Sequence, residues 1–161
     1  MIEKEALKKK VYDKKTAFLK AQHYCAYQER SQQEVRNKLY EWGLHSDDVE
    51  NVIVDLISQN FINEERFAVL FAGGKFRIKK WGRLKIKNEL KLHKISTYCI
   101  RIALESINAE DYIQTLKHII DKKTALTKEK NKFKKISKIA AFAISKGYEP
   151  ELVRELIKNE D

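Results

Sequence analysis

Proline and glycine are scarce in this 161-residue chain, which contains one proline and five glycines. These two residue types supply most tight turns, so the sequence offers little material for a fold built from short strands and hairpins. Lysine, glutamate, leucine and isoleucine dominate instead, and this balance favours helices. The length is sufficient for one large domain or a short array of small ones with a buried core. The composition therefore predicts an all-α protein.

Cysteines are few, and long hydrophobic runs are absent from the sequence. Cys25 and Cys99 lie far apart, and neither belongs to a Cys-x-x-Cys motif. We therefore expect two small buried hydrophobic residues in a reducing compartment, not a disulfide or a metal site. Residues 1–5 are charged and lack the apolar core of a signal peptide, and no stretch resembles a membrane span. These absences predict a cytoplasmic protein with no membrane partner.

The sequence also lacks a recognisable catalytic arrangement. Its four histidines share no metal-ligand spacing, and no carboxylate is paired with a nucleophile or a base. Gly73-Gly74 has neither the preceding strand nor the Gly-Lys-Ser/Thr ending of a phosphate loop, so we expect a helix kink or close packing there. Trp42 and Trp81 stand beside glycines at helix ends, where packing is favoured over base stacking. We expect no metal, no cofactor, no small-molecule substrate and no enzymatic activity.

What the chain does contain is an internal repeat. Six packing positions recur after 51 residues and again after 53 more, and except at Lys94 each step places apolar on apolar or glycine on glycine. A period near fifty is typical of a supersecondary unit copied in tandem. The three sets are Val35, Leu39, Gly43, Val49, Val52 and Ile53; Ile86, Leu90, Lys94, Ile100, Ala103 and Leu104; and Ile139, Ala143, Gly147, Val153, Leu156 and Ile157.

The first unit is predicted to form three helices. Residues 17–25 carry apolar side chains at helical spacing. Ser31 and Glu34 have the spacing of a capping box that begins a second helix, and Gly43 supplies its left-handed end. Ser46, followed by two aspartates, begins a third helix in the way that the helix dipole favours.

The second unit repeats this scheme. Asn63, followed by two glutamates, begins its first helix, and Trp81-Gly82 interrupts the chain before the second. Ser96 has the position of an N-cap for the third helix. A short glycine-containing turn between the second and third helices of a unit is the helix-turn-helix layout.

The third unit contains about eight more residues than the second, by comparison of the two repeat spacings. It begins at Asn108, and the extra residues are expected in a longer first helix or loop around residues 122–130. A helix from about residue 129 to 146 follows, and Pro150 sits in the first turn of the last helix, where its missing N–H costs nothing.

These patterns predict an all-α fold of three tandem three-helix, helix-turn-helix-like repeats. No single unit can close a core alone, so neighbours should stack in an elongated, curved array. The predicted organisation is a charged N-terminal arm at 1–15 and repeats at 16–61, 62–106 and 107–161, the last with a basic insertion.

Positive charge is concentrated in two runs. The chain has 33 basic and 23 acidic residues, a net charge of +10. Residues 75–94 contain nine basic residues and one acid, and residues 122–138 contain eight lysines and one acid. One such run could simply be a solvated helix face, but two in adjacent units indicate a continuous basic strip on the second helices of units two and three. The predicted contact residues are Lys75, Arg77, Lys79, Lys80, Arg83, Lys87, Lys91, Lys132, Lys134 and Lys135.

The third helices of the first and last units are acidic. Residues 45–58 and 149–160 each contain four carboxylates, which phosphate repels. A helix-turn-helix protein inserts this helix in the major groove, so a sequence-specific repressor is disfavoured. The basic strip suits contact with a DNA backbone or a protein surface without choice of sequence.

Four motifs of the chain are specific enough to indicate a family. They are Arg30-Ser31…Glu34-Val35…Lys38-Leu39…Gly43, Val52-Ile53…Leu56, Phe61-Ile62-Asn63-Glu64-Glu65-Arg66-Phe67-Ala68, and Arg77…Lys80-Trp81-Gly82…Ile86…Glu89-Leu90…Ile95. With these motifs the chain resembles the RecX family of recombination regulators over residues 27–158. It departs from the family pattern at Asn63-Glu64-Glu65, where an acidic pair with aspartate is usual, at Lys94, where glycine is usual, and in the basic insertion.

This resemblance implies a function in recombination, DNA repair and the SOS response. RecX-like proteins are all-helical, lie in the groove of RecA filaments on single-stranded DNA, and usually inhibit ATP hydrolysis, strand exchange and co-protease activity. The implied partners are the RecA filament and the single-stranded DNA within it. The alternative is a non-specific module that binds single-stranded or duplex DNA through a basic helical face and competes with filaments for single strands.

Overall fold

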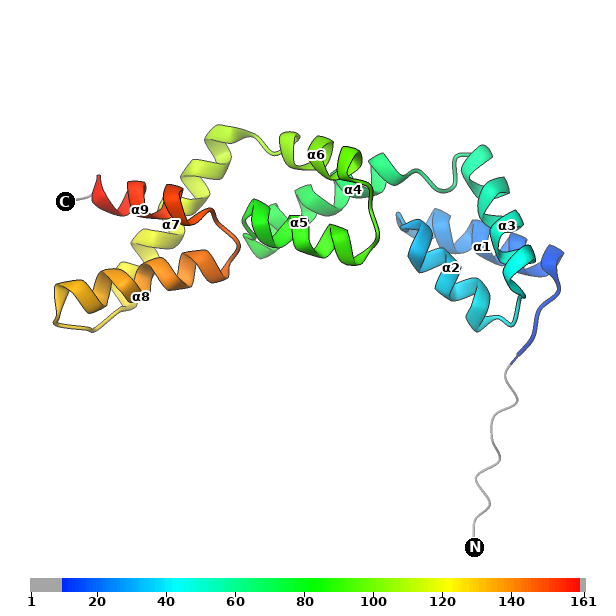
Figure 1. The fold of residues 1–161 in the computed structure, drawn as a ribbon, viewed down its shortest axis with the longest axis horizontal. Coiled ribbons are helices and arrows are strands. Elements are labelled where there is room, and N and C mark those ends of the chain that lie inside the picture. Colours follow the sequence, from blue (N-terminus) through cyan, green and yellow to red (C-terminus); the bar gives the residue numbers. More distant parts are fainter. Residues whose placement is uncertain (1–9, 160–161) are drawn as a thin grey trace, which may run out of the picture. The chain divides into compact units, whose positions relative to one another are not determined.

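The chain is all-helical, as predicted. The structure is a computed structural model that describes residues 10–159, and within that range the chain forms nine α-helices, one π-helical turn and no strand (Figure 1). It divides into two compact units, residues 1–67 and 68–161. The boundary falls inside the first turns of helix α4 (Glu64–Gly74).

The first unit contains α1 (Lys14–Tyr27), α2 (Gln32–Glu41) and α3 (Ser46–Ser58), which pack on one another. The predicted capping box is confirmed. The Ser31 N–H donates to Glu34 Oε2 at 2.7 Å, and the Glu34 N–H donates to Ser31 Oγ at 3.1 Å. The core is built from small and aliphatic residues: Ala17, Ala21, Cys25, Val35, Leu39, Leu44, Val49, Val52, Ile53, Leu56 and Ile62.

The charged arm predicted for residues 1–15 overlaps the first helix. Residues 1–9 lie outside the described range, but Lys14 and Lys15 belong to α1, because the Asp13 side chain accepts the Thr16 N–H at 2.8 Å and begins the helix there. Hydrogen bonding to the Thr16 side chain, and then to the Thr16 N–H, lowers the pKa of Asp13. The prediction of an arm was therefore wrong for these last residues.

Tyr12 and Trp42 join the start of the chain to the end of α2. The Tyr12 N–H donates to the Trp42 carbonyl at 3.0 Å, and the two rings meet edge to face with centroids 6.1 Å apart. Tyr24 contacts the Trp42 ring from α1 in the same geometry, at 6.5 Å. The packing role predicted for Trp42 is confirmed.

Arg66 ties the beginning of α4 to the rest of the first unit. Its guanidinium forms an ion pair with Glu29, and its Nη2 donates to the Asn60 carbonyl at 3.1 Å. The Arg66 N–H donates to Asn63 Oδ1 at 2.9 Å, which confirms Asn63 as the cap of this helix.

The second unit contains six further α-helices and the π-helical turn. Helix α5 packs on α6, and α7, α8 and α9 pack on one another. Ser96 caps α6 as predicted, and Asn108, where the third unit was predicted to begin, caps α7; each accepts a backbone N–H through its side chain. The elements after α4 are η1 (Lys75–Lys79), α5 (Arg83–Leu92), α6 (Thr97–Glu105), α7 (Ala109–Leu126), α8 (Lys132–Ser145) and α9 (Pro150–Lys158).

Gly73-Gly74 ends α4, and the chain continues directly into the π-helical turn η1. A π-turn widens a helix locally, which is the irregularity expected at this glycine pair. The turn ends at Lys80, which adopts a left-handed conformation with φ of 58°. Because α5 begins only after Gly82, the first four members of the basic strip, Lys75 to Lys80, do not lie on the second helix of the unit, and that part of the prediction was wrong.

Only part of the extra length of the third repeat lies in its first helix and the loop that follows, because the second helix is also longer, with 14 residues in α8 against 10 in α5. Helix α7 has 18 residues, against 14 in α1. The helix predicted from residue 129 begins at Lys132 instead, because the Asn131 side chain caps it by accepting the Lys134 N–H at 3.0 Å. Pro150 occupies the first turn of α9, as predicted.

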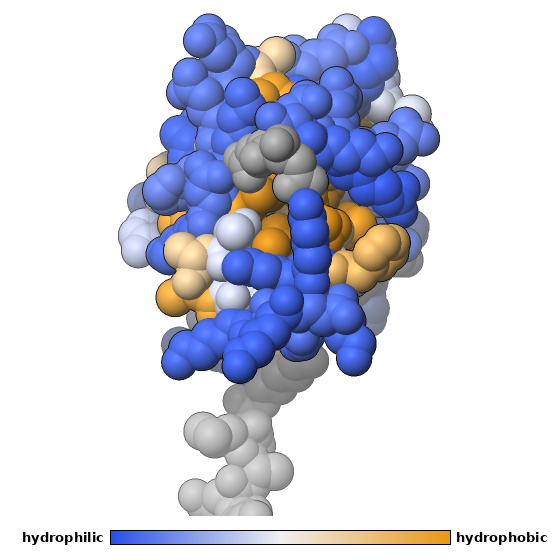
Figure 2. Space-filling model, turned by 90° about the vertical axis from the view of Figure 1, so that its left-hand side faces the viewer, coloured by the Kyte–Doolittle hydropathy of each residue, from blue (hydrophilic) through white to orange (hydrophobic). Residues whose placement is uncertain are grey.

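Seen from the side that carries α8 and α9, the surface is mainly hydrophilic, with apolar side chains showing in its centre (Figure 2).

The three repeats turn between their second and third helices in the same way. Gly43, Lys94 and Gly147 have φ of 90°, 58° and 99°. In each turn the next residue donates its N–H to the carbonyl five residues before it, at 3.2, 3.1 and 3.4 Å. Lys94, which replaces a glycine, therefore closes its turn as the glycines do, although a Cβ makes the left-handed conformation unfavourable.

Lys94→Gly is expected to stabilise the protein by about 1 kcal/mol, because glycine adopts positive φ without steric cost. The free energy of unfolding in urea measures the change. Lys87→Gly, in the middle of α5, is the matched control and is expected to destabilise by about 1 kcal/mol. Equal destabilisation by both substitutions would contradict a left-handed Lys94.

Candidate functional site

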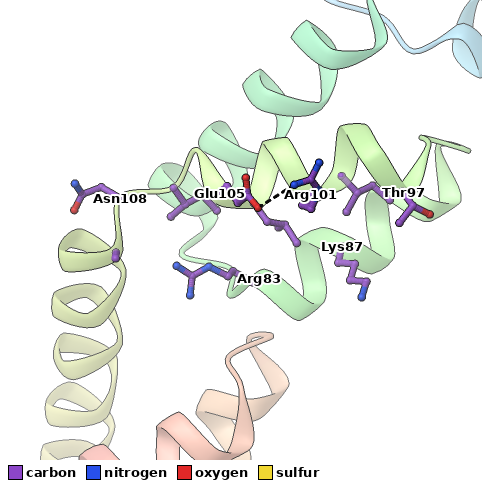
Figure 3. Close-up of a pocket in the computed structure, with 10 residues that line it drawn as sticks. Arg83, Lys87, Thr97, Arg101, Glu105 and Asn108 are labelled. Atoms are coloured by element: carbon purple, nitrogen blue, oxygen red, sulfur yellow. Dashed lines mark ion pairs between the residues drawn. The ribbon is translucent and has the colours of Figure 1, made fainter.

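A groove in the second unit lies between α5, α6 and the start of α7 (Figure 3). Its volume is about 780 Å³. Arg83 and Lys87 line it from α5 and Arg101 lines it from α6, while buried apolar side chains form its floor. The residues that line it are Arg83, Lys87, Thr97, Ile100, Arg101, Leu104, Glu105, Ile107, Asn108 and Ala109.

The rim of this groove is positively charged. Glu105 is the one carboxylate among the lining residues, and it lies one helical turn from Arg101, with Arg101 Nη1 and Glu105 Oε1 3.7 Å apart (Figure 3). Lys87 is exposed. A cationic rim around an apolar floor is suited to an acidic partner that also presents apolar side chains.

Arg83 has a structural function as well as a place in the groove. Its guanidinium carbon lies 3.8 Å from the centre of the Tyr112 ring, and its Nη1 is 4.0 Å from Glu149. The Arg83 N–H donates to the Tyr112 hydroxyl at 3.0 Å, and that hydroxyl lies 2.8 Å from Glu149 Oε2. Arg83 therefore joins α5 to α7 and to the start of α9, a role that the sequence did not indicate.

The beginning of α5 is fixed to the turn between α8 and α9 by backbone hydrogen bonds. The Gly82 N–H donates to the Lys146 carbonyl at 2.8 Å, and the Leu84 N–H donates to the Gly147 carbonyl at 3.0 Å. A Cβ on Gly82 would overlap the carbonyl group of Gly147. These contacts hold the second and third repeats together.

Two buried tyrosines fill the space behind this junction. The rings of Tyr112 and Tyr148 are 5.0 Å apart, and the Tyr148 hydroxyl donates to the Lys80 carbonyl at 2.9 Å. Burial raises the pKa of both phenols, so both stay protonated at neutral pH. The junction thereby sets the position of Lys80 as well as that of Arg83.

The other predicted contact residues lie in different surroundings. Lys75 is half-buried, with its Nζ 5.3 Å from the Phe71 ring and 5.0 Å from the Trp81 ring. Arg77 and Lys80 line a hollow of about 370 Å³ beside α7. Lys79 and Lys91 are exposed on η1 and α5.

The predicted lysines of the third repeat lie on the first turn of α8. Lys132 and Lys134 are exposed, Lys135 is half-buried, and none of the three lines the groove or the hollow. The ten predicted residues are thus not gathered in one cavity, and their shared contact with a partner stays a prediction. Sequence reasoning missed Arg101, since a single arginine in an otherwise uncharged segment gives no signal.

Within residues 10–159, no group of three or more potential ligand side chains could hold a metal ion, and no helix has both the length and the apolar character needed to cross a bilayer. Cys25 and Cys99 are both buried, as predicted. Burial raises the pKa of Cys25 to about 11, so this thiol is protonated and unreactive at neutral pH.

Comparison with known proteins assigns the three repeats. Residues 17–56, 63–104 and 110–157 match the family models of the first, second and third three-helix domains of RecX. The chain belongs to the RecX family. The resemblance found in the sequence and the tandem three-helix fold are both confirmed.

The relatives are regulatory proteins. The chain is 32% identical over 137 residues to the regulatory protein RecX of Clostridium perfringens strain 13, covering 81% of this chain and 64% of that protein. It is 27% identical over 156 residues to the regulatory protein RecX of Halalkalibacterium halodurans, covering 96% and 59%. The chain thus spans about three fifths of the length of these relatives.

A solved structure supports the fold. The crystal structure of RecX from Lactobacillus salivarius superposes with a TM-score of 0.83 and 21% sequence identity, covering 91% of this chain and 95% of that one. The chain is therefore a member of a family of regulatory proteins, built from that family's three consecutive domains.

Proposed function

We propose that the chain is a cytoplasmic binding protein, not an enzyme, that binds the RecA filament on single-stranded DNA. It inhibits the ATPase, strand-exchange and co-protease activities of that filament. The observation that carries the proposal is family membership in all three domains, because RecA is the partner that the RecX resemblance implies. The cationic residues of the second unit supply a surface for the acidic protein groups and DNA phosphates of such a filament.

The groove between α5 and α6 supports binding to protein as well as to DNA. Its floor of Ile100, Leu104 and Ile107 can bury apolar side chains, which phosphates do not offer, and its rim attracts acidic ones. A ligand that binds one filament state more tightly than another shifts the population by that difference in affinity. Inhibition then requires preferential binding to a filament conformation that hydrolyses ATP slowly.

Titration of this protein against the single-stranded-DNA-dependent ATPase of the cognate RecA tests the proposal. The wild-type chain is expected to lower the rate, and less strongly at higher salt. Lys87→Glu/Lys91→Glu reverses two exposed charges on α5 and is expected to raise the concentration for half-inhibition about tenfold or more. Lys117→Glu/Lys128→Glu makes the same change in net charge at exposed positions outside the groove and should inhibit like the wild type. An unchanged ATPase rate at saturating wild-type protein would reject the regulator.

The second candidate is a DNA-binding module that only competes for single strands. It is favoured by Lys79 and Lys80, which are exposed and form no ion pair with any residue that the structure describes. Binding of the wild-type chain to DNA-free RecA separates the two candidates. Binding to single-stranded DNA without binding to DNA-free RecA identifies the DNA module, whereas binding to DNA-free RecA supports the regulator.

A further inference from the structure

A second cavity of the second unit contains cationic side chains and no carboxylate. It has a volume of about 320 Å³ and lies between the end of α7, the end of α8 and the residue that follows η1. Four lysines and a histidine stand around three apolar side chains. The residues that line it are Lys80, His118, Ile119, Lys122, Lys123, Leu126, Phe142 and Lys146.

The four lysines of this cavity have no acidic partner. Among residues 10–159 none of them forms an ion pair. Unpaired like charges around one small cavity repel one another, so an anion bound among them gains a strong Coulomb attraction. The charge pattern selects an anion with several negative groups.

The cavity also contains an aromatic ring with two ammonium groups near it. The Lys123 Nζ is 4.6 Å and the Lys146 Nζ 5.8 Å from the centre of the Phe142 ring. Phe142 is half-buried, and Leu126 beside it is exposed. A phosphodiester with an unstacked base satisfies both features, because the base can lie on the ring while the phosphates meet the lysines. The bases of a duplex are already stacked and cannot reach the ring.

The fold sets the positions of these groups before any ligand binds. The Lys80 carbonyl accepts a hydrogen bond from the Tyr148 hydroxyl, and the Lys146 carbonyl accepts one from the Gly82 N–H. The backbone of both lysines is therefore held in place by hydrogen bonds. Lys122, Lys123 and Leu126 lie on the last turns of α7. The preorganised backbone reduces the entropy lost on binding.

We propose that this cavity is a binding site for single-stranded DNA, in which Lys80, Lys122, Lys123 and Lys146 hold successive phosphates and Phe142 stacks on a base. The site rests on the proposed function in that the filament supplies the single strand. It is distinct from the groove between α5 and α6, which remains available to protein. The chain thus has one surface for protein and another for DNA.

Anisotropy of a fluorescently labelled oligothymidylate, titrated with the full chain in the absence of RecA, tests this site. Lys122→Glu/Lys123→Glu is expected to weaken binding about tenfold or more and to reduce the slope of log K against log salt by about 1.4, the value for two lost phosphate contacts. Phe142→Leu is expected to weaken binding about tenfold with an unchanged slope, because it removes stacking and no charge.

Matched controls separate the site from net charge and from general apolar contact. Lys117→Glu/Lys128→Glu carries the same charge change outside the cavity, and Phe133→Leu alters a phenylalanine that is 85% exposed elsewhere on α8. Both should bind like the wild type, and circular dichroism should show that all variants are folded. Equal losses in variants and controls, or no loss in the variants, would overturn the site.

Competition identifies the ligand. Inorganic phosphate and polyglutamate, added at constant ionic strength, are expected to leave the oligothymidylate bound; displacement by either rejects a single-strand site in favour of a simple anion or acidic-peptide site. Failure of this site and failure of the proposed function give different results. If the wild type binds DNA through this cavity but leaves the RecA ATPase unchanged, the regulator is contradicted and the site is not. If the cavity variants bind DNA normally and still inhibit the ATPase, the site is contradicted and the regulator is not.

Discussion

Gly82→Ala is expected to lower the free energy of unfolding of the second unit by about 3 kcal/mol. The added Cβ would overlap the Gly147 carbonyl and the Tyr148 nitrogen, which are backbone atoms and cannot rotate aside as a side chain can. To make room, the beginning of α5 must move away, which breaks the hydrogen bonds from Gly82 to Lys146 and from Leu84 to Gly147. Urea unfolding followed by circular dichroism measures the loss.

Gly74→Ala is the control for this substitution. Gly74 is helical, with φ of −65°, and a Cβ there meets nothing within 4 Å. Alanine at this position should leave stability unchanged or raise it by about 0.5 to 1 kcal/mol, because it restricts the unfolded chain. If the two alanine variants were equally stable, the second and third repeats would not meet at Gly82.

The contrast between these two glycines shows what local sequence can and cannot predict. Gly43 and Gly147 are identifiable as helix ends because each follows an apolar helical pattern at a fixed distance. The reason for glycine at position 82 is a backbone segment far along the chain, and nothing near Gly82 encodes that contact. The sequence showed a break in the helix there and no partner for it.

The helices themselves were predictable because their signals are local. Ser31, Ser96 and Asn108 each cap the helix that their spacing indicates, and the buried positions recur with the repeat. Val35, Ile86 and Ile139 are all buried, eight residues before a left-handed turn residue. Agreement between capping, periodicity and burial is what makes such a fold readable from one sequence.

The candidate site was less predictable because it depends on tertiary contacts. A count of charges found the basic run of residues 75–94 but could not show that Arg83 stacks on Tyr112 or that Lys75 lies between two aromatic rings. It also could not show that some of these basic residues lie in the π-helical turn and the others on α5. Lys122 and Lys123 were visible only as part of a second run, and their cavity is formed by side chains from three separate elements.

Tyr112→Ala is expected to be more damaging than Gly82→Ala, with a loss of about 4 kcal/mol. The ring is fully buried between Phe76 and Tyr148, with centroids at 5.8 and 5.0 Å, so its removal leaves a large cavity at the junction of the second and third repeats. Tyr98→Ala, at a position 59% exposed on α6, is the control and should change stability by less than about 0.5 kcal/mol. Comparable losses from the two substitutions in urea would show that Tyr112 does not support the junction.

Tyr112→Phe isolates the hydroxyl and is expected to cost about 1 to 3 kcal/mol at neutral pH, because the partly buried Arg83 N–H loses its acceptor. The cost should shrink as the pH rises. Burial raises the pKa of this phenol above its unfolded value of about 10, so the folded state keeps a proton that the unfolded state releases. The stabilisation by the hydroxyl is therefore present below about pH 10 and is lost as the pH rises toward the folded pKa. Free energies of unfolding at about pH 8 and 10.5 should show a smaller difference between wild type and Tyr112→Phe at the higher pH, and a constant difference would contradict a buried, protonated Tyr112.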